Sequence, residues 1–268
     1  MSEHVDRESK GYPFRGEINT AHLGMEWAEA PWDTAIYGDP VLQITRIEVH
    51  GKDAGQDMTA FELAREAAGS ALTSCRLPHD RLRESMLLEA HGFRFIEMLY
   101  LPELGQLAAR PAFDDGSLEV SRATVSDLAR VVEIAGTAFQ NERFHVDPRL
   151  SPELSDRRYR NWAHSSLVHP KQCLFVLREG LLLIGFFVIE TQADGTCYWH
   201  LNAVAPEHQG KGYGRRAWSA MINYAQANGA QRILTSVAAR NHRVINLYAG
   251  LGFRFSPPLM TFHWVRQD

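Results

Sequence analysis

A glycine-rich loop between a predicted strand and a predicted helix constrains the fold of this chain more than any other stretch. The strand ends near Val204, and the loop reads QGKGYG over residues 209–214. Glycines at a helix N-terminus present backbone N–H groups that lack helical partners, together with the positive end of the helix dipole. That arrangement suits a phosphate or pyrophosphate group, and Lys211, Arg215 and Arg216 add positive charge there. The loop therefore predicts an anion-binding turn between strand and helix.

Two well-known phosphate loops do not fit this stretch. A P-loop requires GxxxxGK[ST], but Lys211 lies between glycines and no Ser or Thr follows it. A dinucleotide-binding loop requires GxGxxG early in a βαβ unit, with an acidic residue about twenty positions later. Here the order is GxGxG late in the chain, and residues 232–236 contain no carboxylate. Both kinds of loop are therefore excluded.

The strand and helix patterns around the loop predict a mixed α/β (α+β) domain over residues 117–268. Ser126 is placed as the N-cap of its first helix, and a second helix follows Pro152. Apolar periodicity and β-branching give a strand at 117–124, a helix at 126–139, strands at 172–178, 181–190 and 196–205, a helix at 212–228, a strand at 232–237, a helix at 241–251 and a strand at 253–264. This order predicts a central mixed, largely antiparallel sheet flanked by helices.

The first part of the chain repeats one junction of the second part. GFRF occurs at 92–95 and again at 252–255, and the match extends upstream, LLEAHGFRF over LYAGLGFRF. A strand at 41–49, helices at 58–72 and 80–92 and a strand at 93–101 are predicted around the first copy. Residues 1–20 are polar and are expected to be flexible. The stretch 102–115, with two prolines and a glycine, is the best candidate for a linker.

Composition describes an ordinary globular protein and excludes several classes. A length of 268 residues is compatible with two domains. A net charge of −4 argues against nucleic acid as a partner. The three cysteines form no CxxC and favour a reducing compartment. The N-terminus lacks the apolar region of a signal peptide, and the longest apolar run, 181–189, is too short for a bilayer. We therefore expect a cytoplasmic protein without a membrane partner.

The glycine loop and its downstream partners carry a resemblance to a known family. Gln209, Gly212 and Gly214 fill the pattern [RQ]xxGxG, and Asn241 and the segment NLYAGLGF (246–253) follow in the expected order. Over residues 117–268 the chain resembles the GNAT superfamily of N-acetyltransferases. The resemblance implies the GNAT fold and acetyl-CoA as co-substrate. It implies that the backbone N–H of Val204 faces the thioester oxygen, and that the coenzyme is bound by Val204, Gln209, Gly210, Lys211, Gly212, Tyr213, Gly214, Arg215 and Asn241.

The resemblance also implies a role for Tyr248, because family members keep a tyrosine there as general acid for the departing thiolate. The alternative is that Tyr248 is an aromatic residue that packs on an amphipathic helix. Acyl transfer to an amine also needs a neutral nucleophile. His200, Glu190 and His208 are the titratable groups near the relevant strands and loop. A histidine on a strand is more often structural than catalytic, and the general base is left open.

Motifs outside the glycine loop indicate a subfamily. APWDTAIYGDP (30–40), CRLPHDRLRESMLLEAHGF (75–93) and FQNERFHVDPRL (139–150) resemble the two-domain bacterial dTDP-fucosamine N-acetyltransferases. Those enzymes acetylate the amine of a TDP-4-amino-4,6-dideoxyhexose. The resemblance implies that Arg143, Phe144, Tyr159, Trp162 and His200 contact the acceptor. The alternative is that the aromatic residues are core residues and that Arg143 is a solvated charge. The neighbouring Arg157, Arg158 and Arg160 are most simply a solvated helix face.

These interpretations predict a GNAT acetyltransferase domain at 117–268 and a smaller, truncated GNAT-like half domain at 21–110. In the first GFRF copy Leu88 stands where the second has Tyr248, and residues 40–87 contain no glycine-rich phosphate loop. The first copy is therefore read as scaffold. No HExxH, histidine cluster or GxSxG occurs, which predicts neither a metal nor a covalent intermediate. Another amine as acceptor, a non-catalytic acyl-CoA sensor and a homodimer all stay open.

Overall fold

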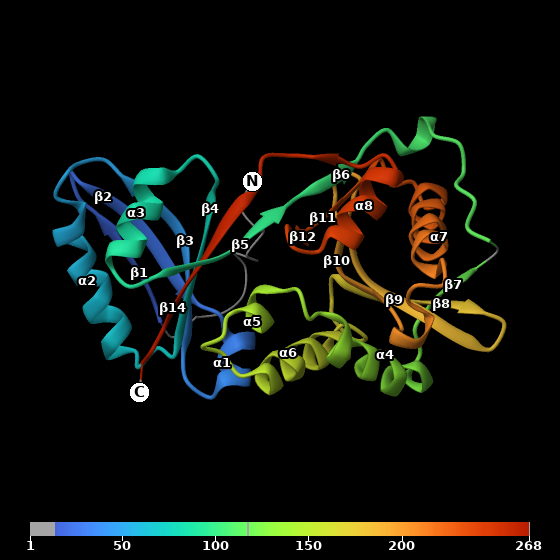
Figure 1. Cartoon of the computed structure of the whole chain (residues 1–268), viewed down its shortest axis with the longest axis horizontal. Coiled ribbons are helices and arrows are strands. Elements are labelled where there is room, and N and C mark those ends of the chain that lie inside the picture. Colours follow the sequence, from blue (N-terminus) through green and yellow to red (C-terminus); the bar gives the residue numbers. More distant parts are fainter. Residues whose placement is uncertain (1–13, 117, 268) are drawn as a thin grey trace. The chain divides into compact units, whose positions relative to one another are not determined.

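The computed structural model describes residues 14–116 and 118–267, and these form two compact units (Figure 1). Unit 1 comprises Met1–Met98, Asp147–Leu150 and Leu259–Asp268, and unit 2 comprises Leu99–Val146 and Ser151–Pro258. The expectation of a flexible stretch at 1–20 lies outside the described residues for positions 1–13. Residues 15–19 of that stretch form a strand. The domain boundaries proposed from the sequence stay a prediction.

The sheet of unit 2 is mixed and mostly antiparallel, as predicted. Among its described strands, β10 and β11 form the parallel pair, and the other pairs are antiparallel. Its order is β13 (Arg254–Phe255), β6 (Pro102–Leu104), β11 (Arg232–Thr235), β10 (Thr196–Val204), β9 (Leu182–Thr191), β8 (Gln172–Glu179) and β7 (Glu119–Arg122). The short β12 (Val237–Ala238) pairs with Tyr100 and Leu99 at the end of β5.

Helices cover both faces of this sheet because its central strands are apolar on both sides. Phe187 and Trp199 pack with α7 (Tyr213–Ala227) and α8 (His242–Gly250), whereas neighbouring side chains of the same strands pack with α4 (Val125–Ala138) and α6 (Pro152–Ser165). Successive residues of a strand point to opposite faces, so these are two separate cores. The remaining helical segments are α5 (Arg143–Val146) and the 3-10 turns η1 (Leu107–Ala109) and η2 (Pro206–His208).

The start of α4 corrects one detail of the sequence interpretation. Thr124, not Ser126, is the N-cap, and it forms a capping box in which its backbone N–H donates to Asp127 Oδ2 at 2.8 Å. Asp127 is the third residue of the helix and satisfies a donor that would otherwise lack a partner. Ser126 lies inside the first turn. Thr124 and Ser126 are both residue types that cap helices, two positions apart, so the sequence pattern fits either one.

Unit 1 has a second mixed sheet with its own helices. The order of its strands is β1 (Arg15–Asn19), β2 (Leu23–Glu29), β3 (Val41–Val49), β4 (Leu72–Pro78), β14 (Leu259–Val265) and β5 (Arg94–Tyr100). β3 and β4 are parallel. The helices are α1 (Pro31–Tyr37), α2 (Ala54–Ala67) and α3 (Leu82–Ala90). Met58, Phe61 and Leu88 of α2 and α3 pack on the apolar side chains of the strands.

Each sheet contains a strand from the opposite end of the sequence. In unit 1, β14 lies between β4 and β5, and in unit 2, β6 lies between β11 and β13 (Figure 1). The predicted strand 253–264 is therefore two strands, separated at Pro257 and Pro258, which cannot donate ladder hydrogen bonds. The predicted linker at 102–115 likewise begins with β6. Nothing in the local sequence states which sheet a short strand will join.

The GFRF repeat is a repeat of structure. Gly92 and Gly252 both have positive φ, 82° and 83°, at the C-terminal ends of α3 and α8. In both places the following phenylalanine donates its backbone N–H to the carbonyl five residues earlier, Phe93 to Leu88 and Phe253 to Tyr248, each at 3.0 Å. These are left-handed helix ends of one kind, for which glycine carries no Cβ penalty. The two parts of the chain thus share one kind of helix–glycine–strand junction.

Candidate active site

In unit 2, strands β10 and β11 are paired at one end and separate at the other. Their parallel pairing runs from Thr196↔Arg232 to Trp199↔Thr235, and beyond this pair the two strands are no longer hydrogen-bonded partners. β10 continues for five more residues to Val204, still paired with β9 on its other side. The chain after β11 instead enters β12, which pairs with the end of β5. Residues 200–204 therefore form a strand edge that no described strand pairs with on the β11 side.

Every second backbone N–H group along this edge points away from β9. The N–H of Ala205 donates to the carbonyl of Ile184 on β9 at 2.9 Å. Because N–H directions alternate along an antiparallel strand, the N–H groups of Val204 and Asn202 point toward the separated strand. The Val204 N–H thus lies on the open side of β10, and its contact with a thioester stays a prediction. The N–H of Asn202 faces the same side, which the sequence interpretation missed because the motif offers no sign of strand register.

Close packing of β9 against β10 holds this edge in place. Gly185 is the register partner of Val204. A Cβ at Gly185 would come within 2.4 Å of the Ala203 carbonyl oxygen, so no larger residue fits without a backbone shift. A glycine inside a buried strand pattern is a sign of such close approach, and this sign was present in the sequence.

The glycine loop follows β10 directly, and two of its glycines need their conformational freedom. Gly210 and Gly212 have φ of +75° and +84°, a region that side chains with a Cβ rarely adopt. Gln209 Nε2 donates to the carbonyl of Val204 at 3.1 Å and fastens the loop to the strand end. Gly214 lies in the first turn of α7, where a Cβ would meet only Leu247 at 3.8 Å. At Gly214 no side chain covers the backbone of the first turn of α7.

The cationic and aromatic side chains of the loop divide into two groups. Lys211 and Arg215 are exposed. Arg216, in contrast, donates to Glu179 Oε1 at 2.6 Å and to the Gly116 carbonyl at 2.7 Å. Tyr213 donates its hydroxyl to the same carboxylate. These two hydrogen bonds lower the pKa of Glu179. Arg216 and Tyr213 thus anchor the start of α7, and Lys211 and Arg215 are the cations that face solvent.

Asn241 has a structural role that its motif position did not state. It is the N-cap of α8, and its side-chain oxygen accepts the backbone N–H of Val244 at 3.3 Å. An asparagine at this position satisfies one of the N–H groups that a helix start leaves without a partner. Its contact with a coenzyme stays a prediction.

Tyr248 is buried on α8, next to the point where β10 and β11 separate. Only 1% of it is exposed, and its ring lies 4.7 Å from that of Phe253. Burial raises the pKa of the Tyr248 phenol, and hydrogen bonding with Trp218, Thr235 and Asn202 opposes the effect without cancelling it. Tyr248 is thus a packing residue, and its hydroxyl also stays protonated near neutral pH beside Asn202 of the strand edge.

The predicted acceptor residues separate into buried and accessible ones. Phe144 and Tyr159 are 2% and 4% exposed, and Tyr159 stacks on Phe139 at 4.7 Å. Arg143 is also buried, with its guanidinium 4.6 Å from the Phe144 ring centroid. Phe144 and Tyr159 thus fit the packing alternative of the sequence interpretation, whereas Arg143 is not the solvated charge that this alternative supposed. Trp162 is partly exposed.

Arg158 also departs from the sequence interpretation, which assigned it to a solvated helix face. It is half-buried, and its guanidinium lies 4.3 Å from the ring centroid of Phe144 and 5.4 Å from that of Trp162. A guanidinium stacks favourably on aromatic faces at such distances. Arg157 and Arg160 are exposed, as the sequence interpretation supposed.

Two of the three candidate bases lie together, and the third lies elsewhere. His200 Nε2 is 3.0 Å from Glu190 Oε2, on adjacent strands. The Trp162 ring centroid is 6.2 Å from that of His200, and its indole N–H donates to Gln172 Oε1 at 3.1 Å. His208 instead lies on η2, beside Tyr213. The structure thus brings His200, Glu190 and Trp162 into one partly exposed cluster.

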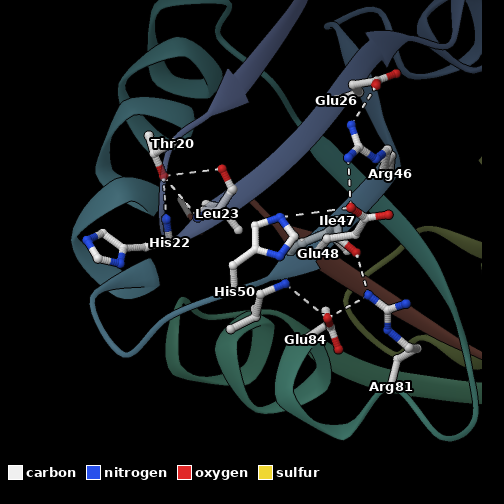
Figure 2. A network of polar contacts seen from close by, with 11 residues as sticks. Thr20, His22, Leu23, Glu26, Arg46, Ile47, Glu48, His50, Arg81 and Glu84 are labelled. Carbon is white, nitrogen blue, oxygen red and sulfur yellow. Dashed lines mark hydrogen bonds and ion pairs between the residues drawn. The ribbon is translucent and has the colours of Figure 1, made fainter.

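Unit 1 contains a counterpart of the strand separation. β3 and β4 are paired from Val41↔Leu72 to Ile44↔Cys75, and β3 then continues alone on that side to Val49. Here side chains of α3 occupy the edge. Glu84 Oε1 accepts the backbone N–H of Val49 at 3.0 Å, and Arg81 donates to the same oxygen at 2.7 Å (Figure 2). Arg81 also reaches the carbonyl of Ile47 at 3.5 Å.

The connection from strand to helix also differs in unit 1. Residues 50–53 join β3 to α2, whereas residues 205–212 join β10 to α7. The shorter connection has one glycine, Gly51, and a Cβ there would come within 2.5 Å of the His22 ring. Asp53 adds a negative charge beside it. Unit 1 therefore has neither the loop nor the accessible strand edge of unit 2.

No group of three or more His, Cys, Asp or Glu residues with metal-ligand geometry occurs within residues 14–116 and 118–267. In the same part of the chain, every helix is too short or too polar to cross a membrane.

Comparisons with known proteins agree with this geometry. The model of the acetyltransferase (GNAT) family matches residues 130–253. The spore coat polysaccharide biosynthesis protein SpsD of Bacillus subtilis (strain 168) is 19% identical over 241 residues, covering 88% of this chain and 82% of SpsD.

Solved structures show a similar fold. A GCN5-related N-acetyltransferase from Sphaerobacter thermophilus has a TM-score of 0.62 at 12% identity, over 91% of this chain and 80% of that one. A tandem GNAT protein from the clavulanic acid biosynthesis pathway has a TM-score of 0.60 at 16% identity, over 96% and 86%. At these identities the structures establish the fold alone.

Proposed function

We propose that this chain is an acetyl-CoA-dependent N-acetyltransferase of the GNAT superfamily, whose family model matches residues 130–253, and that it acts on the amine of a nucleotide-linked amino sugar. The observation that carries the proposal is the strand edge of β10. Its N–H groups at Asn202 and Val204 face the separated strand, its end leads into the glycine loop, and the Tyr248 hydroxyl lies alongside.

The glycine loop is the proposed site of the coenzyme's pyrophosphate. Its N–H groups at the start of α7 carry the positive end of the helix dipole, which stabilises anions. Lys211 and Arg215 are exposed there and supply charge. The pantetheine arm, which has amide groups of its own, can pair with the strand edge of β10 as a neighbouring strand would. This assignment uses Val204, Gln209, Gly210, Gly212 and Gly214 as the sequence interpretation does.

The proposed reaction is direct attack of the amine on the thioester carbonyl. A C–N bond forms, the C–S bond breaks, and the nitrogen loses one proton while the departing thiolate gains one. The backbone N–H of Asn202 or Val204 stabilises the charge that develops on the carbonyl oxygen. Tyr248, protonated because burial raises its pKa, donates the proton to the thiolate. No covalent enzyme intermediate is needed.

The acceptor class rests on two supports of different kind. SpsD is named for spore coat polysaccharide biosynthesis, which agrees with a sugar as acceptor. The motifs around Trp32, Arg143 and Asp147 resemble those of dTDP-fucosamine N-acetyltransferases, which points to a TDP-4-amino-4,6-dideoxyhexose. Trp162 and His200, which are partly exposed, are the predicted contacts best placed to meet such an acceptor.

A thiol-release assay with acetyl-CoA tests this function. TDP-4-amino-4,6-dideoxyhexoses should support release of free CoA, whereas a peptide N-terminus and a polyamine should not. Turnover with the peptide or polyamine alone would overturn the sugar assignment and leave an acetyltransferase of another amine. Acetyl-CoA binding without turnover on any amine would identify an acyl-CoA sensor instead.

A further inference from the structure

The function proposed above uses His200 only as an acceptor contact and gives the pair formed by His200 and Glu190 no chemical role. Both side chains are partly exposed, 20% for His200 and 24% for Glu190. A carboxylate only accepts hydrogen bonds, so His200 Nε2 donates in their 3.0 Å contact, and Nδ1 is the ring nitrogen that can take up a proton when the imidazole is neutral. A neutral histidine held in one tautomer by a carboxylate is suited to take up a proton.

The position of His200 in β10 relates the pair to the strand separation. Trp199 is the last residue of β10 paired with β11, and His200 is the next residue. The register of β10 with β9 shifts between Trp199 and Leu201, so His200 sits in a β-bulge. Bulges re-aim side chains next to active sites. His200 therefore lies at the point where the two strands part.

His200 and Tyr248 lie on opposite faces of the sheet at this point. Tyr248 belongs to the core on the α7 and α8 side, together with Trp199 and Val204. His200 lies beside Trp162, which packs on the α4 and α6 side. The Tyr248 hydroxyl neighbours Thr235, the register partner of Trp199. The Tyr248 hydroxyl, a proton donor, and the His200 ring, a proton acceptor, thus lie on opposite faces of the sheet at the place where β10 and β11 separate.

We propose that His200 is the general base of the reaction and that Glu190 positions it and stabilises its protonated form. The inference rests on the proposed function. The acceptor ammonium gives one proton to His200 Nδ1, directly or through one water, and the neutral amine then forms the C–N bond. The thiolate that leaves takes the Tyr248 proton. The nitrogen, which is cationic again after the attack, gives its second proton to the Tyr248 phenolate, so the amide, the thiol and the Tyr248 hydroxyl are all neutral and His200 carries the remaining proton. The groups facing His200 include Tyr198 of β10 and Trp162 of α6, behind which lies the Arg158 guanidinium.

Two small amines test the proposal without the natural acceptor. At about pH 7 methylamine is a cation, as alkyl amines are, whereas hydroxylamine is already neutral and needs no base. In His200→Gln, methylamine acetylation should fall about 100-fold or more, and hydroxylamine acetylation should change little. Glu190→Gln should show the same selectivity to a smaller extent, and Glu190→Asp should restore part of the loss.

Controls separate this inference from a structural effect. His164→Gln changes an exposed histidine of α6 and should leave both amines unaffected. Acetyl-CoA affinity and the thermal unfolding midpoint of His200→Gln should match those of the unmodified protein. Equal losses with both amines, or no loss with either, would overturn the assignment of His200. If the unmodified protein binds acetyl-CoA but acetylates neither these amines nor a TDP-4-amino-4,6-dideoxyhexose, the proposed function fails, and this inference fails with it.

Discussion

The two strand separations of this molecule begin alike and end differently. In each, a parallel pair of strands makes four register pairs, after which one strand continues alone for five residues. In unit 2 that strand leads into an eight-residue glycine loop at 205–212, and its edge has no strand beside it. In unit 1 the connection is four residues, 50–53, and Glu84 and Arg81 occupy the edge. The same backbone frame thus serves as a candidate coenzyme site in one unit and as scaffold in the other.

Corresponding positions show how few residues make this difference. β4 and β11, α3 and α8, and β5 and β13 all begin 160 positions apart, as with Leu72 and Arg232. By that offset Arg81 corresponds to Asn241, Glu84 to Val244 and Leu88 to Tyr248. The side chains that fill the edge in unit 1 are small or apolar in unit 2, and the phenol of unit 2 is an aliphatic side chain in unit 1.

The largest expected effect concerns the residue that distinguishes α8 from α3. Tyr248→Phe removes the proposed proton donor but keeps the packing ring, so turnover should fall about 100- to 10,000-fold. Acetyl-CoA affinity, measured by calorimetry, should remain nearly intact. Tyr224→Phe, which removes a hydroxyl from a ring packed on Phe175 in the same core, is the matched control. A loss of affinity with turnover preserved would assign Tyr248 to packing or binding.

The next effect concerns the loop that unit 1 lacks. Gly212→Val places a β-branched residue at φ +84° and distorts the N–H groups of the loop. Loss of one or two charge-assisted hydrogen bonds should weaken acetyl-CoA binding about 10- to 100-fold. Gly180→Val, at φ +60° in the hairpin between β8 and β9, carries comparable backbone strain and should leave affinity unchanged. Calorimetry of the unmodified protein should give one acetyl-CoA per chain, and two would contradict a scaffold role for unit 1.

The smallest effect on function should come from the side chain that fills the edge in unit 1. Glu84→Ala leaves the Val49 N–H without its acceptor, which should lower the free energy of unfolding by about 1–3 kcal/mol, with acetyl-CoA affinity unchanged. Burial raises the pKa of Glu84, but hydrogen bonds from Arg81 and Val49 outweigh it, so the pKa lies below its ordinary 4.5. A lowered pKa stabilises the fold above the unfolded-state value.

The pH dependence of that variant provides its check. The stabilisation by Glu84 should be complete near pH 7 and should disappear as pH falls through the lowered folded-state pKa. Chemical denaturation of the unmodified protein and of Glu84→Ala should therefore give free energies that differ near pH 7 and converge at about pH 3. Curves that stay parallel over this range would show that the carboxylate charge is not what stabilises the edge.

Much of the site was readable from local patterns. The spacing of Gln209, Gly212 and Gly214 predicted the loop, and positive φ at Gly212 agrees with it. The helix–glycine–strand junction at Gly252 predicted a structural repeat of Gly92, and their backbone geometry matches. These signals are local because a left-handed backbone or a helix end is decided by the residues within one turn.

Other assignments depended on contacts between distant residues. Phe144 and Tyr159 have the composition of an aromatic binding surface, but packing of α4 against α6 buries Tyr159, and Phe144 is buried on α5 beside the Arg158 guanidinium. Arg216 has the charge of a phosphate ligand, but Glu179, thirty-seven positions away, engages it. Composition cannot distinguish an aromatic residue in a core from one at a site, because both uses require the same side chain.

The sequence by itself determined the glycine loop, the helix–glycine–strand repeat, most of the order of helices and strands over residues 117–268, and the resemblance to the GNAT superfamily. Only the tertiary structure decided that β14 completes the sheet of unit 1 and β6 that of unit 2, which backbone N–H groups of β10 face an unpaired edge, and that His200 pairs with Glu190 across strands. The physical reason is how far apart in the sequence the residues lie that decide each feature. Turns, caps and periodicity follow from neighbouring residues, whereas strand pairing, register and side-chain partnership depend on residues far apart in the chain, whose hydrogen bonds exist only once the sheet has formed.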